Sequence, residues 1–70
     1  METKIITPLT AREKEVFELM KQGKTSKQIA ELLHRSIYTV NTHRETILWK
    51  LNAHTTIEAI NNEKKLHEPD

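Results

Sequence analysis

The segment SIYTVNTHRETILWKL, residues 36–51, carries amides, hydroxyls, an imidazole and cations between regularly spaced apolar residues. Asn41 and Thr42 are short enough to reach base edges in the major groove of DNA, where an Asn amide can pair with adenine and a Thr methyl can touch a thymine methyl. Arg44 and Lys50 carry the charge that phosphates attract. The segment therefore has the chemistry of a nucleic-acid surface, provided that a helix exposes these side chains.

The charges nearly cancel over the whole chain, to a formal net charge of +1, but they are unevenly distributed. Residues 1–20 carry three Lys and Arg against four acids, residues 21–50 carry six against two, and residues 51–70 carry two against four. His34 and His43 also lie in the basic middle segment. A local basic excess suits nucleic acid, although modest charge runs also occur on ordinary solvated faces.

Capping signals predict the elements that must position these residues. Three Thr-x-x-Glu/Gln capping boxes and one capping serine precede apolar residues at helical spacing; they are Thr10–Glu13, Thr25–Gln28, Thr55–Glu58 and Ser36. The expected helices span residues 11–22, 26–33, 37–52 and 56–65. Gly23 and Asn52 follow helices in positions that favour the left-handed conformation, and His34 and Arg35 form the turn between the second and third helices.

Seventy residues predict one small domain, here an N-terminal arm over 1–8, a domain over 9–66 and a frayed tail over 67–70. The fold class is all-α, a compact four-helix bundle in which the second and third helices have the proportions of a helix-turn-helix. The expected core consists of Val16, Leu19, Met20, Ile29, Leu33, Val40, Ile47 and Leu51. Trp49 either shields the side of the core or belongs to a dimer surface, and His43 is expected to pack partly buried rather than to contact a phosphate.

The composition argues against other classes of protein. The chain has no cysteine, no signal peptide and no apolar stretch of membrane-spanning length, so we expect a soluble cytoplasmic protein without a membrane partner. Its four histidines fall on different elements, and no pair has the spacing of a zinc-binding HExxH motif. There is no Gly-rich phosphate loop and no nucleophile elbow. We therefore expect no metal, no cofactor and no enzymatic activity.

Three spaced motifs carry a resemblance to a known family. They are LTxRExEV over residues 9–16, GxTxKxIAxxL over residues 23–33 and SxxTVxxHRxxIxxKL over residues 36–51. In this order they closely resemble the LuxR-type helix-turn-helix domain of bacterial transcription regulators, over about residues 7 to 60. The resemblance implies a DNA-binding fold whose third helix lies in the major groove, whose fourth helix often supplies a dimer contact, and whose sites are two-fold promoter sequences. It also implies that a receiver or ligand-sensing domain, fused on the N-terminal side, controls the DNA-binding domain. We therefore expect this chain to be either an isolated effector module or a variant that works without a fused sensor.

The resemblance also implies roles for individual residues. The expected base readers match Asn41, Thr42 and Glu45, and Tyr38 joins them as a residue at the start of the reading helix. Phosphate contacts are expected from Lys24, Thr25, Ser26, Lys27, Arg35, Thr39, Arg44 and Lys50. The fourth helix would form a weak homodimer through Ile57, Ile60 and Asn61, which DNA would strengthen.

Several residues depart from the family pattern. Asn41 stands where Lys is frequent, and Glu45 places an acid among phosphates unless it accepts from a cytosine or pairs with a cation. Arg35 replaces an apolar residue of the turn, and Ile37 and Tyr38 replace polar or basic ones.

The function expected from these features is sequence-specific transcriptional regulation through double-stranded DNA. One alternative is a protein-interaction module of the same fold with little DNA affinity, which Glu45, Ile37 and Tyr38 favour. A second is the promoter-reading end of a sigma factor, which would need RNA polymerase as a partner. A steep loss of binding with salt distinguishes DNA from an apolar protein partner, because neutralised phosphates release counterions.

Overall fold

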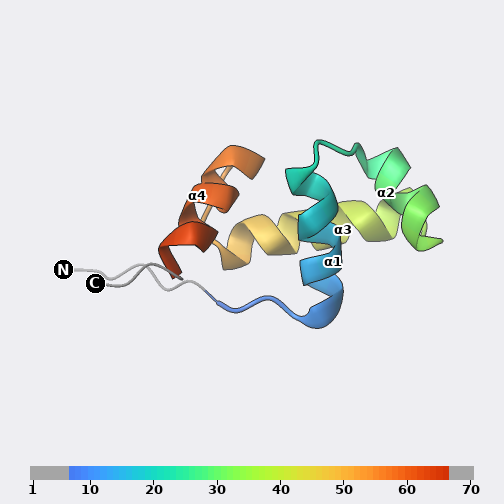
Figure 1. Ribbon diagram of the computed structural model, residues 1–70. Helices are drawn as coiled ribbons and strands as arrows, with labels where there is room; N and C mark the ends of the chain where they lie inside the picture. The colour runs from blue at the N-terminus through green and yellow to red at the C-terminus, as the bar shows by residue number, and fades with distance from the viewer. Residues whose placement is uncertain (1–6, 67–70) are drawn as a thin grey trace.

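The computed structural model describes residues 7–66 and consists of four helices, with no strand in that range. The helices are α1 (Ala11–Lys21), α2 (Ser26–Leu33), α3 (Ile37–Lys50) and α4 (Thr56–Leu66). The longest helix, α3, contacts the other three: α1 crosses it, α2 lies toward one end and α4 toward the other (Figure 1). The predicted all-α helix-turn-helix bundle is confirmed. The expected tail, 67–70, and most of the expected arm, 1–8, lie outside the described residues.

Reciprocal capping boxes fix the starts of α1 and α2. The Thr10 hydroxyl accepts from the Glu13 amide at 3.2 Å, and the Glu13 carboxylate accepts from the Thr10 amide at 2.9 Å. Thr25 and Gln28 repeat this arrangement with the same two distances. Each box satisfies two backbone groups that a helix terminus would otherwise leave unpaired, which is why these two starts were predictable from the sequence.

The start of α4 differs from the predicted box. The Thr55 hydroxyl accepts from the Glu58 amide, but the Glu58 carboxylate accepts from the His54 amide at 2.6 Å instead of closing onto Thr55. That hydrogen bond from the His54 backbone holds the pKa of the exposed Glu58 carboxyl below its usual value. The prediction of a helix start was correct, but the prediction of a closed box was wrong, because the backbone before Thr55 brings the amide of His54 to the carboxylate.

Three residues with positive φ end the first three helices. Gly23 has φ +84°, His34 has φ +56° and Asn52 has φ +54°. The expectations for Gly23 and Asn52 are confirmed. Two non-glycine residues thus accept the left-handed conformation, which is uncommon outside Asn, Asp and His. Only three to five residues separate consecutive helices, which keeps the helices close together.

The core gathers one face of each helix around α3. Six of the eight predicted core residues are buried, and Leu19 and Leu33 are half-buried against them. The core also contains three buried residues that were not predicted, Phe17, Ala30 and Ala59. On α1 the buried positions are Glu13, Val16, Phe17 and Met20, an i, i+3, i+4, i+7 series in which an acid occupies the first place.

A nearly buried ion pair joins the start of α1 to the end of α3. The Lys50 ammonium donates to the Glu13 carboxylate at 2.7 Å, and the two side chains are 17% and 9% exposed. Burial raises the pKa of the Glu13 carboxyl, but the hydrogen bonds from Lys50 and from the Thr10 amide, with the charge of Lys50, bring this pKa below its usual value. The Lys50 carbonyl also accepts from the Thr7 amide at 2.8 Å, so the segment before α1 is bound to the same end of α3.

A second polar contact attaches α4 to α3. The Asn62 side-chain amide donates to the carbonyls of Leu51 and Asn52 at 2.8 and 3.2 Å. Carbonyls at a helix C-terminus have no partner within the helix, and Asn62 supplies one from another element. No motif in the sequence predicted this role of Asn62.

Breaking the ion pair should destabilise the fold. We expect Lys50→Met to lower the free energy of unfolding by about 2 kcal/mol, because it leaves the nearly buried Glu13 carboxylate without its strongest partner. Urea unfolding followed by circular dichroism measures the change. Lys65→Met, an exposed lysine of α4, is the control and should change stability by less than about 0.5 kcal/mol. Equal effects of the two substitutions would contradict a structural role for Lys50.

The ion pair should also make stability depend on acid pH. Since the pKa of Glu13 is lower in the folded than in the unfolded chain, its contribution is complete above the ordinary glutamate pKa of about 4.3 and disappears as pH falls through the lowered value. The difference in free energy of unfolding between the wild type and Glu13→Gln should therefore be largest near pH 6 and shrink below about pH 4. Urea unfolding at several pH values measures it, and a difference that stayed constant with pH would exclude this coupling.

Candidate nucleic-acid interface

One stripe of α3 faces solvent along the whole helix. Tyr38, Thr42, Glu45 and Trp49 are all exposed and follow one another at spacings of four, three and four residues. Val40 and Ile47, on the opposite side, are fully buried. The helix therefore separates a core face from a polar and aromatic face, as a helix that docks into a groove must.

Two of the expected base readers already make hydrogen bonds in the free protein. Asn41 is exposed beside the stripe, and its Oδ1 accepts from the Ser26 hydroxyl of α2 at 2.6 Å. The Thr42 hydroxyl donates to the Tyr38 carbonyl, one turn earlier, at 3.1 Å. Thr42 thus keeps its oxygen lone pairs and its methyl group for a ligand. The link between Ser26 and Asn41 joins two residues with separate expected roles, and the sequence did not predict it.

The start of α3 exposes large apolar surface next to these polar groups. Tyr38 is 80% exposed, and Leu32 and Ile37, just before and just after the turn, are each about half exposed. Ile37 therefore does not fold back fully into the core. This surface can meet apolar groups such as a thymine methyl.

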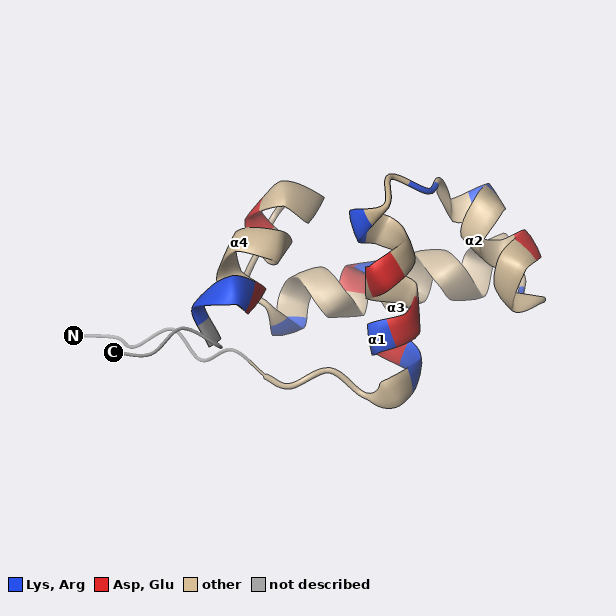
Figure 2. Ribbon diagram, in the orientation of Figure 1, with Lys and Arg blue, Asp and Glu red and all other residues tan. Residues whose placement is uncertain are grey.

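Cations and hydroxyls from the loop before α2, from α2 and from the turn accompany α3. Lys27 and Arg35 are exposed and Lys24 is half-buried. In Figure 2 basic positions occur in the loop between α1 and α2 and in the first turn of α2, and acidic positions occur on all four helices. Thr25 uses its hydroxyl oxygen as the α2 cap, and Thr39 accepts from the Ser36 hydroxyl at 2.9 Å.

Two cations of α3 have a different environment from the rest. Lys50 is bonded to Glu13 and mostly buried, so its charge is engaged within the fold. Arg44 is half-buried, and its Nη1 is buried with no hydrogen-bond partner among the residues that the structure describes. Lys50 and Arg44 therefore lie toward the core side of α3. Their partial burial could not be predicted from the residue types alone.

Two residues of α3, His43 and Trp49, each had two possible roles in the sequence analysis. His43 is half-buried, in agreement with the packing role that was favoured. Trp49 is 74% exposed, so it does not shield the core, and it lies on the same solvent stripe as Tyr38.

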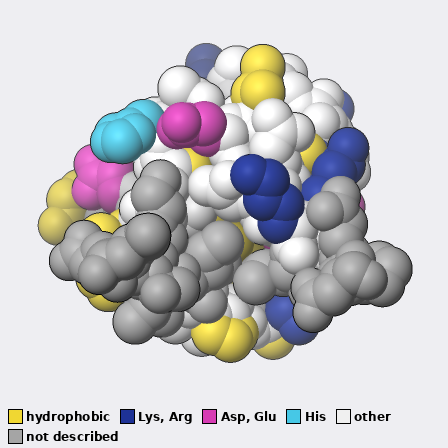
Figure 3. All heavy atoms as spheres, turned by 90° about the vertical axis from the view of Figure 1, so that its left-hand side faces the viewer, with side chains coloured by type: hydrophobic (Ala, Val, Ile, Leu, Met, Phe, Trp, Pro, Cys, Tyr) yellow, Lys and Arg dark blue, Asp and Glu magenta, His cyan; other side chains and the backbone are white. Residues whose placement is uncertain are grey.

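The expected dimer contacts on α4 differ in burial. Ile57 is 72% exposed and Asn61 is exposed, whereas Ile60 is half-buried and packs against the core. Figure 3 views the molecule from the α4 end and shows hydrophobic side chains near a histidine and acidic side chains. His54 Nδ1 lies 3.5 Å from the Glu58 carboxylate at this end. Ile57 is thus the expected contact residue with the most free apolar surface.

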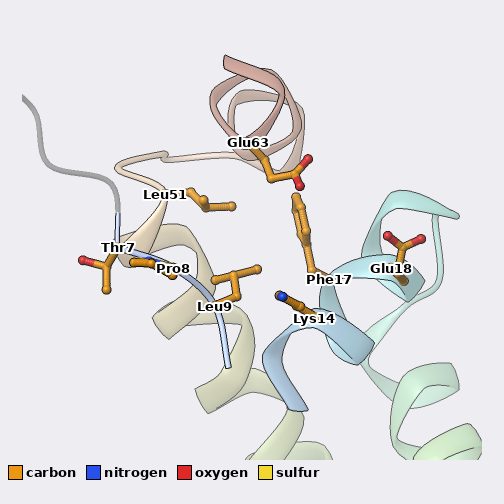
Figure 4. Close-up of a pocket in the computed structure, with 8 residues that line it drawn as sticks. All are labelled: Thr7, Pro8, Leu9, Lys14, Phe17, Glu18, Leu51 and Glu63. Carbon is orange, nitrogen blue, oxygen red and sulfur yellow. The ribbon is translucent and has the colours of Figure 1, made fainter. Parts of the chain in front are cut away.

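A pocket of about 330 Å³ lies between the segment before α1, α1 itself and α4 (Figure 4). Leu9, Phe17 and Leu51 converge on it, and Lys14, Glu18 and Glu63 lie at its edge. None of its lining residues belongs to α2 or to the exposed stripe of α3. The pocket is therefore separate from the candidate interface.

The described part of the chain, 7–66, contains no group of three His, Asp or Glu side chains close enough to hold a metal ion. Within the same range, none of the helices combines the length and the apolar character needed to cross a bilayer.

Comparison with known proteins identifies relatives over most of the chain. The sequence is 50% identical over 52 residues to the response regulatory protein YgeK of Escherichia coli and 47% identical over 58 residues to the transcriptional regulatory protein DesR of Bacillus subtilis. These matches cover 74% and 83% of the chain but only 35% and 29% of the relatives, so the chain spans about a third of their length. The spore germination protein GerE of Bacillus subtilis is 44% identical over 52 residues, which are 74% of the chain and 70% of GerE.

A solved structure shares the fold. The VqmA protein of Vibrio cholera, in a complex with a ligand and DNA, matches with a TM-score of 0.72 and 32% sequence identity, over 89% of the chain and 27% of VqmA. The family model described as bacterial regulatory proteins, luxR family, matches residues 7–62. With its four capped helices, its exposed α3 stripe and this match over most of its length, the chain belongs to the luxR family of bacterial regulatory proteins.

Proposed function

We propose that this chain binds double-stranded DNA in a sequence-dependent manner and regulates transcription, with α3 in the major groove. The observation that carries the proposal is the exposed α3 stripe, which presents Thr42 and Glu45 beside Asn41 while the opposite face of the helix is buried. A major groove about 12 Å wide admits one helix presented in this way. The DNA in the VqmA complex and the name of DesR, a transcriptional regulatory protein, support the same role.

In this proposal the residues around the α3 stripe divide into two groups. Asn41, Thr42, Tyr38 and Glu45 contact bases, and Glu45 acts as an acceptor for a cytosine amino group, since its charge is unfavourable near phosphates. The second group contacts phosphates and consists of Lys24, Thr25, Ser26, Lys27, Arg35, Thr39 and Arg44. Lys50 is left out, because its ammonium is bonded to Glu13. The chain would act without a cofactor and without enzymatic chemistry, in the bacterial cytoplasm, with RNA polymerase as a candidate second partner.

The exposed apolar residues favour one other function. Leu32, Ile37 and Tyr38 are solvent-exposed around the turn, and Trp49 is exposed farther along α3, beyond Thr42 and Glu45. Aromatic residues are enriched in protein–protein interfaces, so a protein-binding module of the same fold is the second candidate. Its binding would depend little on salt.

Salt dependence tests the proposed DNA contacts. We expect binding to duplex DNA, measured by fluorescence anisotropy, to weaken steeply with salt, because cations that neutralise phosphates release counterions. Lys27→Ala and Arg35→Ala should each reduce the slope of log affinity against log salt by about 1. Lys65→Ala on α4 is the matched control and should leave the slope unchanged. Absence of DNA binding at low salt would favour the protein-binding module.

We also propose a weak homodimer through α4, strengthened by DNA with two half-sites. Ile57→Asp should abolish self-association in sedimentation velocity at high micromolar concentration and leave the fold intact, because Ile57 is 72% exposed. Ile60 is a poorer probe, since it packs against the core. Leu32→Asp is the control and should keep wild-type association, because Leu32 belongs to α2, which lies toward the opposite end of α3 from α4 (Figure 1). A wild-type chain that stayed monomeric both alone and on such DNA would refute the dimer.

A further inference from the structure

Trp49 lies on the exposed α3 stripe beyond the residues that are proposed to contact bases. Within α3, which the structure describes in full, it is the only exposed residue after Glu45. Its side chain is 74% exposed, although a tryptophan carries a large apolar surface whose burial is favourable. Because it continues the candidate interface, Trp49 is a candidate for a contact outside the fold.

Helix geometry places Trp49 on the same side of α3 as Thr42. The seven residues between the two positions correspond to an advance of about 10 Å along the axis and to a rotation within about 20° of two full turns. The major groove is about 12 Å wide and curves around the duplex, whereas an α-helix is nearly straight. With Asn41 and Thr42 at the base edges, Trp49 lies farther from them than half the groove width, where a straight helix meets the sugar–phosphate backbone.

The charges near this end of α3 leave such a contact to an uncharged group. The ammonium of Lys50 is bonded to Glu13, and Arg44 is half-buried. Glu45, one turn before Trp49, is acidic and exposed. The indole N–H of tryptophan is a hydrogen-bond donor without charge, and phosphate oxygens accept from neutral donors as well as from cations.

We propose that Trp49 contacts the sugar–phosphate backbone, with its indole N–H donating to a phosphate oxygen and its ring packing on the adjacent sugar. The inference rests on the proposed function and adds an uncharged contact to it. A backbone contact carries no sequence information, and an uncharged group releases no counterion. Trp49 therefore strengthens binding to every DNA sequence alike, by a factor that salt does not change.

The fluorescence of the wild-type chain tests the contact directly, because Trp49 is its only tryptophan. Selection from a random duplex pool supplies the binding site, and duplexes with one or two half-sites are then titrated. We expect acrylamide to lose access to Trp49 on the duplex with one half-site, and to the same degree on the duplex with two. Protection that needed two half-sites would assign Trp49 to a contact between copies and overturn the proposal, as would its absence on both duplexes.

Substitutions measure the strength of the contact on a duplex with one half-site. Trp49→Ala should weaken binding about five-fold, and Trp49→Phe, which keeps a ring but loses the N–H donor, about three-fold. Both variants should keep the wild-type motif and the wild-type slope of log affinity against log salt. Ile57→Ala on α4, whose exposure is similar, is the matched control and should bind as the wild type does. Circular dichroism verifies that all three variants fold.

The outcomes distinguish this inference from the proposed function. Wild-type affinity in either Trp49 variant, an equal loss in Ile57→Ala, a changed salt slope, or a motif altered at one base would overturn the inference and leave DNA binding in place. A wild-type chain that enriched no motif at low salt would overturn the proposed function, and the inference with it.

Discussion

The pairing of Glu13 with Lys50 fixes the frame on which the rest of the structure depends. One carboxylate accepts from the Thr10 amide and from the Lys50 ammonium, so the same side chain starts α1 and holds the end of α3. The Lys50 carbonyl in turn binds the amide of Thr7. Because α1 crosses α3, an anchor at this point holds the angle of α3 against the core. A charge at a nearly buried position is thereby compensated by hydrogen bonds as well as by its partner.

Helix starts were predictable because capping is local. Thr10 and Thr25 bond groups three residues away, and no other part of the chain is needed to satisfy them. Glu58 shows the limit of that reasoning, since its choice of the His54 amide depends on the path of the backbone before the helix. The left-handed stops at Gly23 and Asn52 were predictable for the same local reason as the starts.

Contacts between distant residues were not predictable in the same way. The hydrogen bond of Lys50 to Glu13 was missed because the two residues are 37 positions apart. Phe17 was missed because Glu13 occupies a buried position on its face of α1, and an acid there conceals the apolar period. Asn62 and the bond between Ser26 and Asn41 link helices whose relative placement the sequence does not specify. The exposed face of α3 was largely predictable, since it is the complement of a core stripe that Val40 and Ile47 define.

The double hydrogen bond from Asn62 to the end of α3 has a consequence for the geometry of assembly. It attaches α4 at the point where α3 stops, through the carbonyls of Leu51 and Asn52. In a dimer formed through α4, the two reading helices would be held apart by two such joints, one in each copy. The rigidity of this junction would then limit the spacings between half-sites that the dimer could bind. Asn62 would thereby affect the choice of operator without contacting a base.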